Sequence, residues 1–587
     1  YGGNGMHRQT SWMIINIVLY LGIATGCSEQ APRGSATGIV PSDADAADTV
    51  YFGGPIVTVD DAQPYAEAIA IKNGLILAVG SKSSIESANV GRDTRIIDLE
   101  GRTILPSFID AHGHYISALS VANQAKVYAP PAGPGSDVEG IVEAIEAFRS
   151  AKGIGPGELI QAYGYDDTVM PEGQLLNRDD LDKAFPANPV VVGHVSMHGA
   201  VLNSAALDLY GISADTETPA GGVIVREEGT NEPYGLIMET AYLPVFASLP
   251  KPTGENEVLW TKAAHRLYAE AGVTLAHEGA THADELALLQ RAAAAGAHTI
   301  DVVAYPFMTD LEAIVASNSV DNWGAYEKRL KIGGAKITAD GSPQGKTAYF
   351  TTPYLTGGPG GEEDWFGEPT IPQETLNTLV RKIHAMGVPL IIHTNGDAAI
   401  DMFLEAYEAA RDGDYSKPWN VTTIHTQFMR RDHIPKFVEY DIRPSFYTLH
   451  TYYFASAHEA NRGPEQAAYI SPMRDAIDAG LRPTNHTDFY VAPLDQLFMM
   501  WSAVNRVSRE GEIIGADQQV STLEAIKAQT IWAAEQYGEG NRRGSLEVGK
   551  IADLVILDRN PLDVDPMEIK DIKVLETIKD GKTIFQR

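Results

Sequence analysis

The feature that most constrains the fold is a long series in which short apolar segments alternate with helical patterns. The expected strands cover residues 103–105 with 108–111, then 273–276, 300–305, 332–340, 388–393, 421–425, 442–447 and 482–488. Helical patterns lie between them, for example at 286–295, 376–386 and 523–537, the last opening with the capping-box sequence Ser521-Thr522-Leu523-Glu524. If the first two segments form one strand, the series has eight strands. We therefore expect an α/β fold built on a parallel (β/α)8 TIM-type barrel.

The barrel accounts for only part of the chain. We assign it residues 103–538, with an insertion after strand one at about 115–258, where the series is interrupted. Residues 49–102 and 539–587 contain short alternating strands separated by Gly and Asn-Gly turns, a pattern typical of small β-sheets. The two ends of the chain are expected to form one composite, β-sandwich-like domain.

The N-terminal segment has the pattern of an export signal. A short polar start precedes the apolar run at 12–23, which is short for a membrane span. Small residues ending in Gly-Cys resemble a bacterial lipobox, so residues 6–27 are expected to be a lipoprotein-type signal peptide and 28–48 a flexible tether. This interpretation predicts an exported, periplasmic lipoprotein anchored to a bacterial membrane through Cys27. The alternative is an ordinary signal peptide with an incidental cysteine.

Composition narrows the classes of function. The chain has 587 residues, of which 44% are hydrophobic and 21% charged, an ordinary globular composition that excludes a disordered or fibrous protein. Lys and Arg total 45 against 77 Asp and Glu, a net charge of −32 that repels phosphate backbones and disfavours nucleic-acid binding. Since Cys27 is the single cysteine, no intrachain disulfide can form.

Candidate metal ligands follow several of the expected strands. His112 and His114 flank Gly113 after the first strand, and two imidazoles converging there suit Zn²⁺ or a similar divalent ion. His393, His425 and Asp488 end three other strands. Because the carboxyl ends of barrel strands form the face that carries the active site, these side chains are predicted to lie together.

Lys336 is expected inside the barrel. The apolar residues on either side of it would face the helices, so strand alternation turns Lys336 inward with Thr338 and Asp340. A buried ammonium is costly unless it is paired or modified. Two interpretations stay open, a modified lysine or a structural salt bridge to Asp340 or Asp488.

Taken in order, these residues resemble the metal-ligand set of the amidohydrolase superfamily. The segment at 335–342 (AKITADGS), with Thr347-Ala348 after it, is similar to the YtcJ-like branch, which includes N-substituted formamide deformylases. Three further segments agree with that branch, at 203–207 (NSAAL), 396–398 (GDA) and 549–555 (GKIADLV). The similarity covers roughly residues 50–587.

The resemblance implies a metal centre that holds a divalent cation, most often zinc, as one or two ions. Lys336 would be carboxylated and bridge two metals. His112 and His114 would bind one metal, and His393 and His425 the other. Asp488 would bind metal and shuttle protons as the catalytic residue.

The implied activity is hydrolysis of a C–N bond other than a peptide bond. The substrate would be a small molecule, namely an amide, N-substituted formamide or cyclic amide, attacked by hydroxide that the metal makes available. One alternative is the same site acting on an ester, lactone or phosphotriester. Another is a non-catalytic regulatory or solute-binding lipoprotein that retains the barrel. Self-association into a homo-oligomer is left open.

Four further histidines are candidate substrate contacts. His277, His450 and His486 lie near the ends of strands two, seven and eight, and His198 occupies a family position in the insertion. The branch usually has Glu before the strand-six histidine, where this chain has Ile424. Such departures concern the substrate rather than the metal.

Overall fold

The computed structural model describes residues 46–172 and 174–587. The expected signal peptide, its Cys27 and most of the tether lie outside these residues. Within the described ranges, no helix is both long and apolar enough to cross a membrane.

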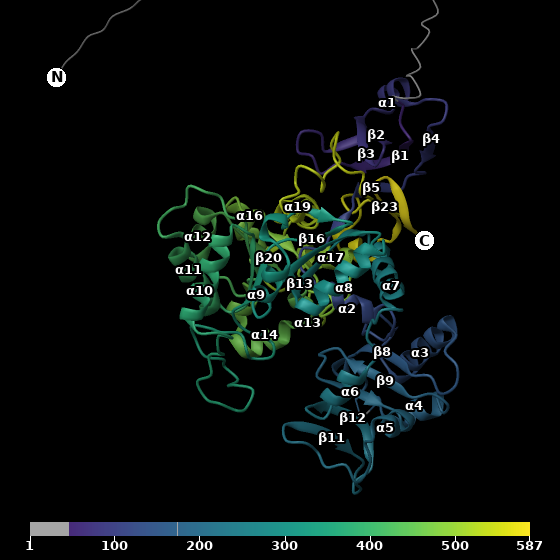
Figure 1. The fold of residues 1–587 in the computed structure, drawn as a ribbon, viewed down its shortest axis with the longest axis vertical. Coiled ribbons are helices and arrows are strands. Elements are labelled where there is room, and N and C mark those ends of the chain that lie inside the picture. The colour runs from purple at the N-terminus through teal and green to yellow at the C-terminus, as the bar shows by residue number, and fades with distance from the viewer. Residues whose placement is uncertain (1–45, 173) are drawn as a thin grey trace, which may run out of the picture. The chain divides into compact units, whose positions relative to one another are not determined.

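An eight-stranded sheet is made from both ends of the chain. Its order is β24-β23-β22-β5-β1-β2-β3, and β4 pairs with β1. In Figure 1 the purple N-terminal strands and the yellow β23 lie together. The close succession of short strands in this sheet explains the turn-rich pattern seen at both ends of the sequence. The strands are β1 (Thr49–Val57), β2 (Tyr65–Lys72), β3 (Leu75–Gly80), β4 (Arg95–Asp98), β5 (Thr103–Pro106), β22 (Leu554–Leu557), β23 (Val574–Lys579) and β24 (Lys582–Gln586).

This sheet changes one expectation. Residues 103–105 and 108–111 were expected to form one barrel strand, but β5 pairs with β22 and β1 in the eight-stranded sheet. Only β6 (Phe108–Ile109) joins the barrel, through β13. Pro106 and Ser107 separate the two segments, and the chain passes there from one sheet to the next.

A six-stranded sheet follows β6 in the chain, in the order β11-β12-β10-β9-β8-β7. Its strands are β7 (Ala125–Lys126), β8 (Ile160–Tyr165), β9 (Val190–His194), β10 (Gly199–Leu202), β11 (Gly222–Arg226) and β12 (Pro233–Glu239). The helices of this region are α3 (Val138–Lys152), α4 (Arg178–Ala184), α5 (Ser204–Tyr210) and α6 (Leu243–Ser248), with a 3-10 turn η1 (Asp167–Val169). A separate apolar core formed by residues such as Ile141, Ile160 and Val190 holds this region together.

The remaining strands give a TIM-barrel-type α/β fold, with a strand at each of the eight expected places. Their ladders form two arcs, β15-β16-β14-β13-β6 and β17-β18-β19-β20-β21. Isolated parallel bridges, Gly113 with Phe489 and Phe307 with Lys336, link the arcs at both junctions. The strands are β13 (Val273–Thr281), β14 (Asp301–Pro306), β15 (Tyr326–Glu327), β16 (Leu330–Ile332), β17 (Ala335–Thr338), β18 (Leu390–Thr394), β19 (Val421–His425), β20 (Ile442–Phe446) and β21 (Thr484–Asn485).

The expected fourth strand is divided at two glycines. The segment before Gly333 pairs with β14, and the segment after Gly334 pairs with β18. A Cβ on Gly333 would lie 2.6 Å from the Tyr305 ring, and one on Gly334 would lie 2.2 Å from the Pro389 carbonyl oxygen. Only glycine permits this close approach, and the ladder breaks there into the two arcs.

The helices of the barrel region are α2 (Tyr115–Val121), α7 (Glu257–Glu270), α8 (Ala283–Ala294), α9 (Leu311–Ser317), α10 (Gln373–Met386), α11 (Asp397–Arg411), α12 (His433–Tyr440), α13 (His450–Tyr453), α14 (Ala455–Arg462), α15 (Pro464–Ala468), α16 (Met473–Asp478), α17 (Gln496–Asn505), α18 (Thr522–Ala528) and α19 (Ile531–Gln536). The eight-stranded sheet has α1 (Lys82–Asn89), and 3-10 turns occur at η2 (Val320–Asn322), η3 (Ala516–Gln518) and η4 (Pro566–Asp571). The capping box at Ser521 and Glu524 is confirmed. The single helix expected over 523–537 is divided at Thr530, whose dihedrals are −129° and −94°.

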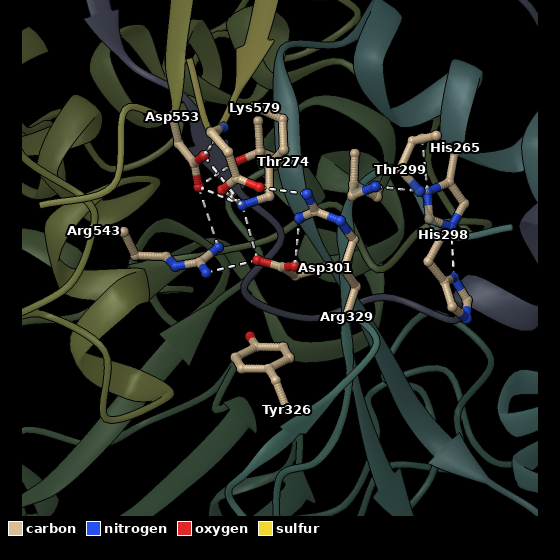
Figure 2. Close-up of polar contacts among 12 residues, drawn as sticks. His265, Thr274, His298, Thr299, Asp301, Tyr326, Arg329, Arg543, Asp553 and Lys579 are labelled. Atoms are coloured by element: carbon tan, nitrogen blue, oxygen red, sulfur yellow. Dashed lines mark hydrogen bonds and ion pairs between the residues drawn. The ribbon is translucent and has the colours of Figure 1, made fainter. Parts of the chain in front are cut away.

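A buried network of charges joins the start of β14 to the C-terminal strands (Figure 2). Asp301 lies 2.6 Å from Nη2 of Arg543 and 3.0 Å from Nζ of Lys579. Asp553 lies 3.3 Å and 3.0 Å from the same two cations. Burial alone would raise the pKa of Asp301, but Lys579 and Arg543 hold it well below its ordinary value. These buried charges are compensated by one another, so removal of one member would leave the others unpaired.

Candidate functional site

The site is built where the first and last barrel strands meet. His112 and His114 follow β6 in a loop rather than in the strand itself, and Asp488 follows β21. A backbone hydrogen bond holds the two segments together, because the His114 amide donates to the Phe489 carbonyl oxygen at 2.6 Å. Nε2 of His112 and Nε2 of His114 each lie 3.4 Å from Oδ1 of Asp488. One carboxylate oxygen therefore faces both imidazoles.

His425 completes a compact donor set. It ends β19, and ligand atoms of His112, His425 and Asp488 all lie within 4.8 Å of one another. All three residues are buried, and Oδ1 of Asp488 accepts no hydrogen bond from any residue that the structure describes. A buried carboxylate oxygen without a donor is uncommon in folded proteins, and three converging N and O donors suit a divalent cation.

His393 lies beside His425, in β18. Their ring centroids are 4.5 Å apart. Nε2 of His393 faces the side-chain amide of Asn395 at 3.0 Å and the Gly341 carbonyl oxygen at 3.3 Å. Burial lowers the pKa of His393 to about 3, so the ring is neutral and can donate a lone pair.

Lys336 is buried in β17, with 2% of its surface exposed. The flanking Ala335 and Ile337 belong to the apolar core under the helices, and the opposite face of the strand carries Lys336 toward the histidines. Burial lowers the pKa of Lys336 to about 8, and the nearby charges of Asp488 and Glu278 oppose this effect. The structure therefore places the side chain among the predicted ligands.

A second layer of histidines orients the first. Nδ1 of His112 lies 3.2 Å from Nδ1 of His277, and Nδ1 of His425 lies 3.1 Å from Nε2 of His486. The other ring nitrogen of His486 lies 2.9 Å from Oγ of Ser445. Such bonds fix the tautomer and the ring plane of a ligating imidazole. The sequence had placed His277 and His486 near strand ends as substrate contacts, and no pattern marked them as partners of other histidines.

The two remaining candidates for substrate contact differ in position: the His450 ring lies near the site, 4.6 Å from the Tyr447 ring, whereas His198 lies in the insertion. The His450 side chain is buried at the start of α13, and its Nδ1 lies 2.9 Å from Nε2 of His458. The side chain of His198 is 64% exposed in the insertion and lies 3.2 Å from Glu239. Neither makes a hydrogen bond to the predicted metal ligands in the part of the chain that the structure describes.

The backbone is unusual at two of the predicted ligands. His425 has a φ of 67° and Asp488 a φ of 53°, both in the left-handed region that residues other than glycine rarely adopt. Close packing is also required beside His112, because a Cβ on Gly279 would lie 2.4 Å from its Cε1 atom. Local strain of this kind often accompanies functional sites and is maintained by the surrounding structure.

Burial sets the charge of the donors. It lowers the pKa of His112 and of His425 well below the ordinary value, and the charge of Lys336 and neighbouring histidines adds to the effect. Burial would raise the pKa of Asp488, but the adjacent His114 lowers it. His112 and His425 are thus neutral and Asp488 is ionised, the protonation states that a divalent cation requires. His114 differs, because the effect of burial on its pKa is outweighed by the Asp488 carboxylate, which raises it.

A small cavity of about 120 Å³ lies near this site. Tyr490 is part of its wall, and the rings of Tyr490 and His114 are 6.2 Å apart. Aromatic residues from the insertion and its return segment, Tyr163, Tyr242 and Phe246, form much of the remaining wall. Serine and glutamine side chains also line it, so the cavity offers both apolar contacts and hydrogen bonds to an uncharged group.

Comparisons with known proteins agree with this geometry. A family model described as "Amidohydrolase family" matches residues 95–585. The chain is 27% identical to the N-substituted formamide deformylase of Arthrobacter pascens, over 92% of this chain and 98% of the relative. It is 26% identical to the putative amidohydrolase YtcJ of Bacillus subtilis (strain 168), over 92% of this chain and 99% of the relative.

A solved structure has the same fold. It is an uncharacterized metal-dependent hydrolase from Pyrococcus horikoshii OT3, with a TM-score of 0.66 and 22% sequence identity. The alignment covers 88% of this chain and 99% of the other. At this level of identity the likeness concerns the fold.

Proposed function

The chain belongs to the amidohydrolase family, and from this premise we propose that it is a metal-dependent hydrolase that cleaves the C–N bond of a small amide. The observation that carries the proposal is the buried convergence of His112, His425 and Asp488 within 4.8 Å. The names of the two relatives, a formamide deformylase and an amidohydrolase, support the choice of bond.

The residues present fit a divalent cation such as Zn²⁺. Oδ1 of Asp488 is buried without a hydrogen-bond donor among the described residues, and the two imidazoles are neutral. We assign the metal ligands as His112, His114, Lys336, His393, His425 and Asp488. A cation held by them would lower the pKa of a water molecule and polarise the substrate carbonyl.

Asp488 is the proposed proton carrier. Its carboxylate is ionised, because the adjacent His114 opposes the effect of burial on its pKa. Oδ1 can accept a proton from the attacking water and return it to the departing nitrogen, which makes the amine a better leaving group. His277 and His486 hold His112 and His425 in place rather than contact the substrate, since both are 0% exposed and bonded to those rings.

Lys336 is proposed to react with carbon dioxide. The neutral Nζ attacks the carbon of CO₂, so that a C–N bond forms while the electron pair of one C=O π bond moves onto oxygen. The nitrogen then loses a proton to solvent, and the product is a carbamate anion. The depressed pKa, about 8, supports this step because it leaves a larger share of the amine neutral near pH 7. The carbamate replaces a buried cation with an anion that can bind metal through oxygen.

The 120 Å³ cavity beside Tyr490 would accept the group carried by the amide nitrogen. Its wall combines Tyr163, Tyr242 and Phe246 with few charges, and Lys251 is the one ionisable side chain on it apart from tyrosines. An uncharged substituent is therefore preferred.

The test is metal analysis together with a substrate panel. Purified protein, reconstituted with zinc, would be assayed on N-substituted formamides, other amides, lactones, esters and phosphotriesters, with released amine or acid as the readout. Turnover of an amide that a chelator abolishes and zinc restores would support the proposal. Turnover confined to lactones, esters or phosphotriesters would contradict the C–N bond assignment. A protein that binds no metal and hydrolyses nothing would favour a binding role.

We also propose that Cys27 carries a lipid and anchors the exported protein to a membrane. The support is the short apolar run that ends in Gly-Cys. Wild type and Cys27→Ser would be expressed with labelled palmitate in a bacterial host and fractionated. Label and membrane recovery in the wild type alone are expected, and an unlabelled, soluble wild type would contradict the anchor.

A further inference from the structure

A second cavity, of about 260 Å³, is lined by the end of α2, by α7, by the start of α17 and by the segment from η4 to β23. None of the predicted metal ligands lines it. We propose that this cavity binds a small organic carboxylate with an apolar body, independently of the catalytic site.

The wall of the cavity carries an excess of positive charge. Four cations line the cavity, Lys126, Lys570, Lys573 and Arg587. Within the described ranges no carboxylate forms an ion pair with any of them at 4.0 Å or less. Lys570 lies 4.7 Å from the centre of the Trp501 ring, and Nε of Arg587 donates to the Val574 carbonyl oxygen at 3.0 Å, so neither charge is cancelled by a carboxylate. In a chain with a net charge of −32, this group of cations provides an attractive field for an anion.

The two carboxylates of the wall are already engaged. Glu270 lies 2.9 Å from Nε of Arg266, and Asp495 accepts the Phe498 amide at 2.9 Å. Both still act on the cations, because Glu270 opposes the effect of burial on the pKa of Lys126, and Lys573 opposes the effect of burial on the pKa of Asp495. With four cations and two carboxylates, the wall keeps an excess of positive charge for a ligand.

The wall also contains a buried polar group without a partner. Gln496 is 2% exposed, and its Oε1 atom has no hydrogen-bond partner among the residues described. Unpartnered buried amide oxygens are rare, and they often mark a place where water or a ligand binds. A side-chain amide can turn to present either its oxygen or its NH₂ group, so Gln496 can donate to a carboxylate.

Apolar and charged residues line different parts of the cavity. Phe489, Leu497 and Val574 are buried and form apolar walls, whereas Lys126 and Lys573 are exposed. A ligand with an apolar body and a charged head would match this arrangement. The volume lies just below the roughly 300–1,000 Å³ of sites for drug-sized ligands, so a molecule the size of benzoate is suitable.

The cavity and the catalytic site are neighbours but use different atoms. Phe489 lines the cavity, and its carbonyl oxygen accepts a hydrogen bond from the His114 amide. Asp488 precedes Phe489 in the chain but does not line the cavity. Substitution of Asp488 should therefore leave the cavity intact. This separation lets the two sites be tested independently.

The experiment is isothermal titration calorimetry of the full chain with benzoate, benzyl alcohol and inorganic phosphate. We expect benzoate to bind with one-to-one stoichiometry. The two other probes should bind at least roughly tenfold more weakly, because benzyl alcohol lacks the negative charge and phosphate lacks the apolar body. The double substitution Lys570→Gln with Lys573→Gln should weaken benzoate by roughly tenfold or more. Lys417→Gln, an exposed lysine outside the cavity, is the matched control and should change nothing.

Three results would overturn the proposal. These are no heat with benzoate at millimolar concentration, phosphate binding as tight as benzoate, and equal benzoate affinity in the double variant and wild type. Asp488→Asn must bind benzoate as wild type does, since loss of binding there would place the ligand in the catalytic site. Circular dichroism of each variant confirms folding. An inactive enzyme that still binds benzoate at this cavity would contradict the proposed function and leave this inference standing.

Discussion

Nδ1 of His425 lies 3.1 Å from Nε2 of His486, whose other nitrogen lies 2.9 Å from Oγ of Ser445. These two hydrogen bonds connect a predicted metal ligand to the core of the barrel, and all three residues are buried. It leaves Nε2 of His425 as the ring atom directed to a metal. The orientation of the ligand thus depends on a residue that need not touch the metal itself.

Replacement of His486 should therefore weaken metal binding. His486→Phe keeps a ring of similar size but removes the partner of His425, and we expect zinc affinity to fall by roughly 10–100-fold. The zinc dissociation constant would be measured by competition with a chelator. Ser445→Ala, one bond further away, is the control and should have a smaller effect. Wild-type zinc affinity in His486→Phe would show that the bond does not orient His425.

Asp488→Asn separates metal binding from proton transfer. Asparagine can still present an oxygen at the same place, but it cannot accept and return a proton. We expect a folded, metal-loaded protein whose turnover is lower by roughly 10²–10⁴-fold. Turnover, bound metal and melting temperature would be measured on one preparation. A stable, metal-loaded variant with nearly wild-type turnover would refute the role of Asp488.

Lys336→Ala should abolish activity and reduce metal content, because the proposed carbamate would be lost. A small carboxylate such as propionate could occupy the space and supply the missing oxygens, and partial recovery of both properties is expected. Mass spectrometry cannot settle the question, since carbamates are labile, so carbon-13 NMR with labelled CO₂ is the direct measurement. Wild-type activity in Lys336→Ala would contradict a ligand role.

The strand ends could be predicted because local rules apply to them. Apolar runs that end in His393, His425 or Asp488 place polar groups at the carboxyl ends of parallel strands, and the structure brings these residues to one place. The inward direction of Lys336 followed from strand alternation in the same way. The alternation of side chains along a strand and the position of the strand end were sufficient to predict these features.

Other features depend on contacts far apart in the sequence. The pairing of β5 with β22 joins residues near 105 and 555, and nothing local at residues 103–106 indicates which sheet they enter. The bond between His112 and His277 spans 165 positions in the chain. The left-handed backbone at His425 could not be predicted either, because histidine adopts it more often than most residues but still in a small minority of cases. Tertiary packing decides each of these features.

The buried charge network predicts a large loss of stability on removal of one member. Arg543 is 2% exposed and neutralises Asp301 and Asp553. Arg543→Met would leave these carboxylates short of a cation, and we expect a loss of roughly 3–5 kcal/mol in the free energy of unfolding. Arg559→Met, which breaks the exposed pair with Glu568, is the control and should cost roughly 1 kcal/mol or less.

Denaturant unfolding would be followed by two probes, so that deviation from a two-state transition is detected. An equal loss of stability in the two arginine variants would show that the network contributes no more than a surface ion pair. A more stable Arg543→Met protein would mean that desolvation of the charges outweighs their attraction.

The last prediction concerns pH and a pair of histidines drawn in Figure 2, far from the metal ligands in the chain. Nδ1 of His265 accepts the amides of Thr299 and Ile300 at 3.0 Å and 2.9 Å, and its Nε2 lies 3.0 Å from Nδ1 of His298. A proton on Nδ1 would break both backbone bonds. Burial, with the charge of His298 next in importance, lowers the pKa of His265 well below its ordinary value.

The folded chain therefore keeps His265 neutral, while the unfolded chain protonates it below about pH 6.5. The unfolded state binds the additional proton, so stability is complete above that pH and falls as the pH decreases, by about 1.4 kcal/mol per pH unit for this one group. His265→Gln retains an acceptor but cannot titrate. It should be less stable than wild type at pH 8 and lose less stability between pH 6.5 and 5. Unfolding free energies at half-unit pH steps provide the comparison, and identical slopes in His265→Gln and wild type would show that His265 does not account for acid sensitivity.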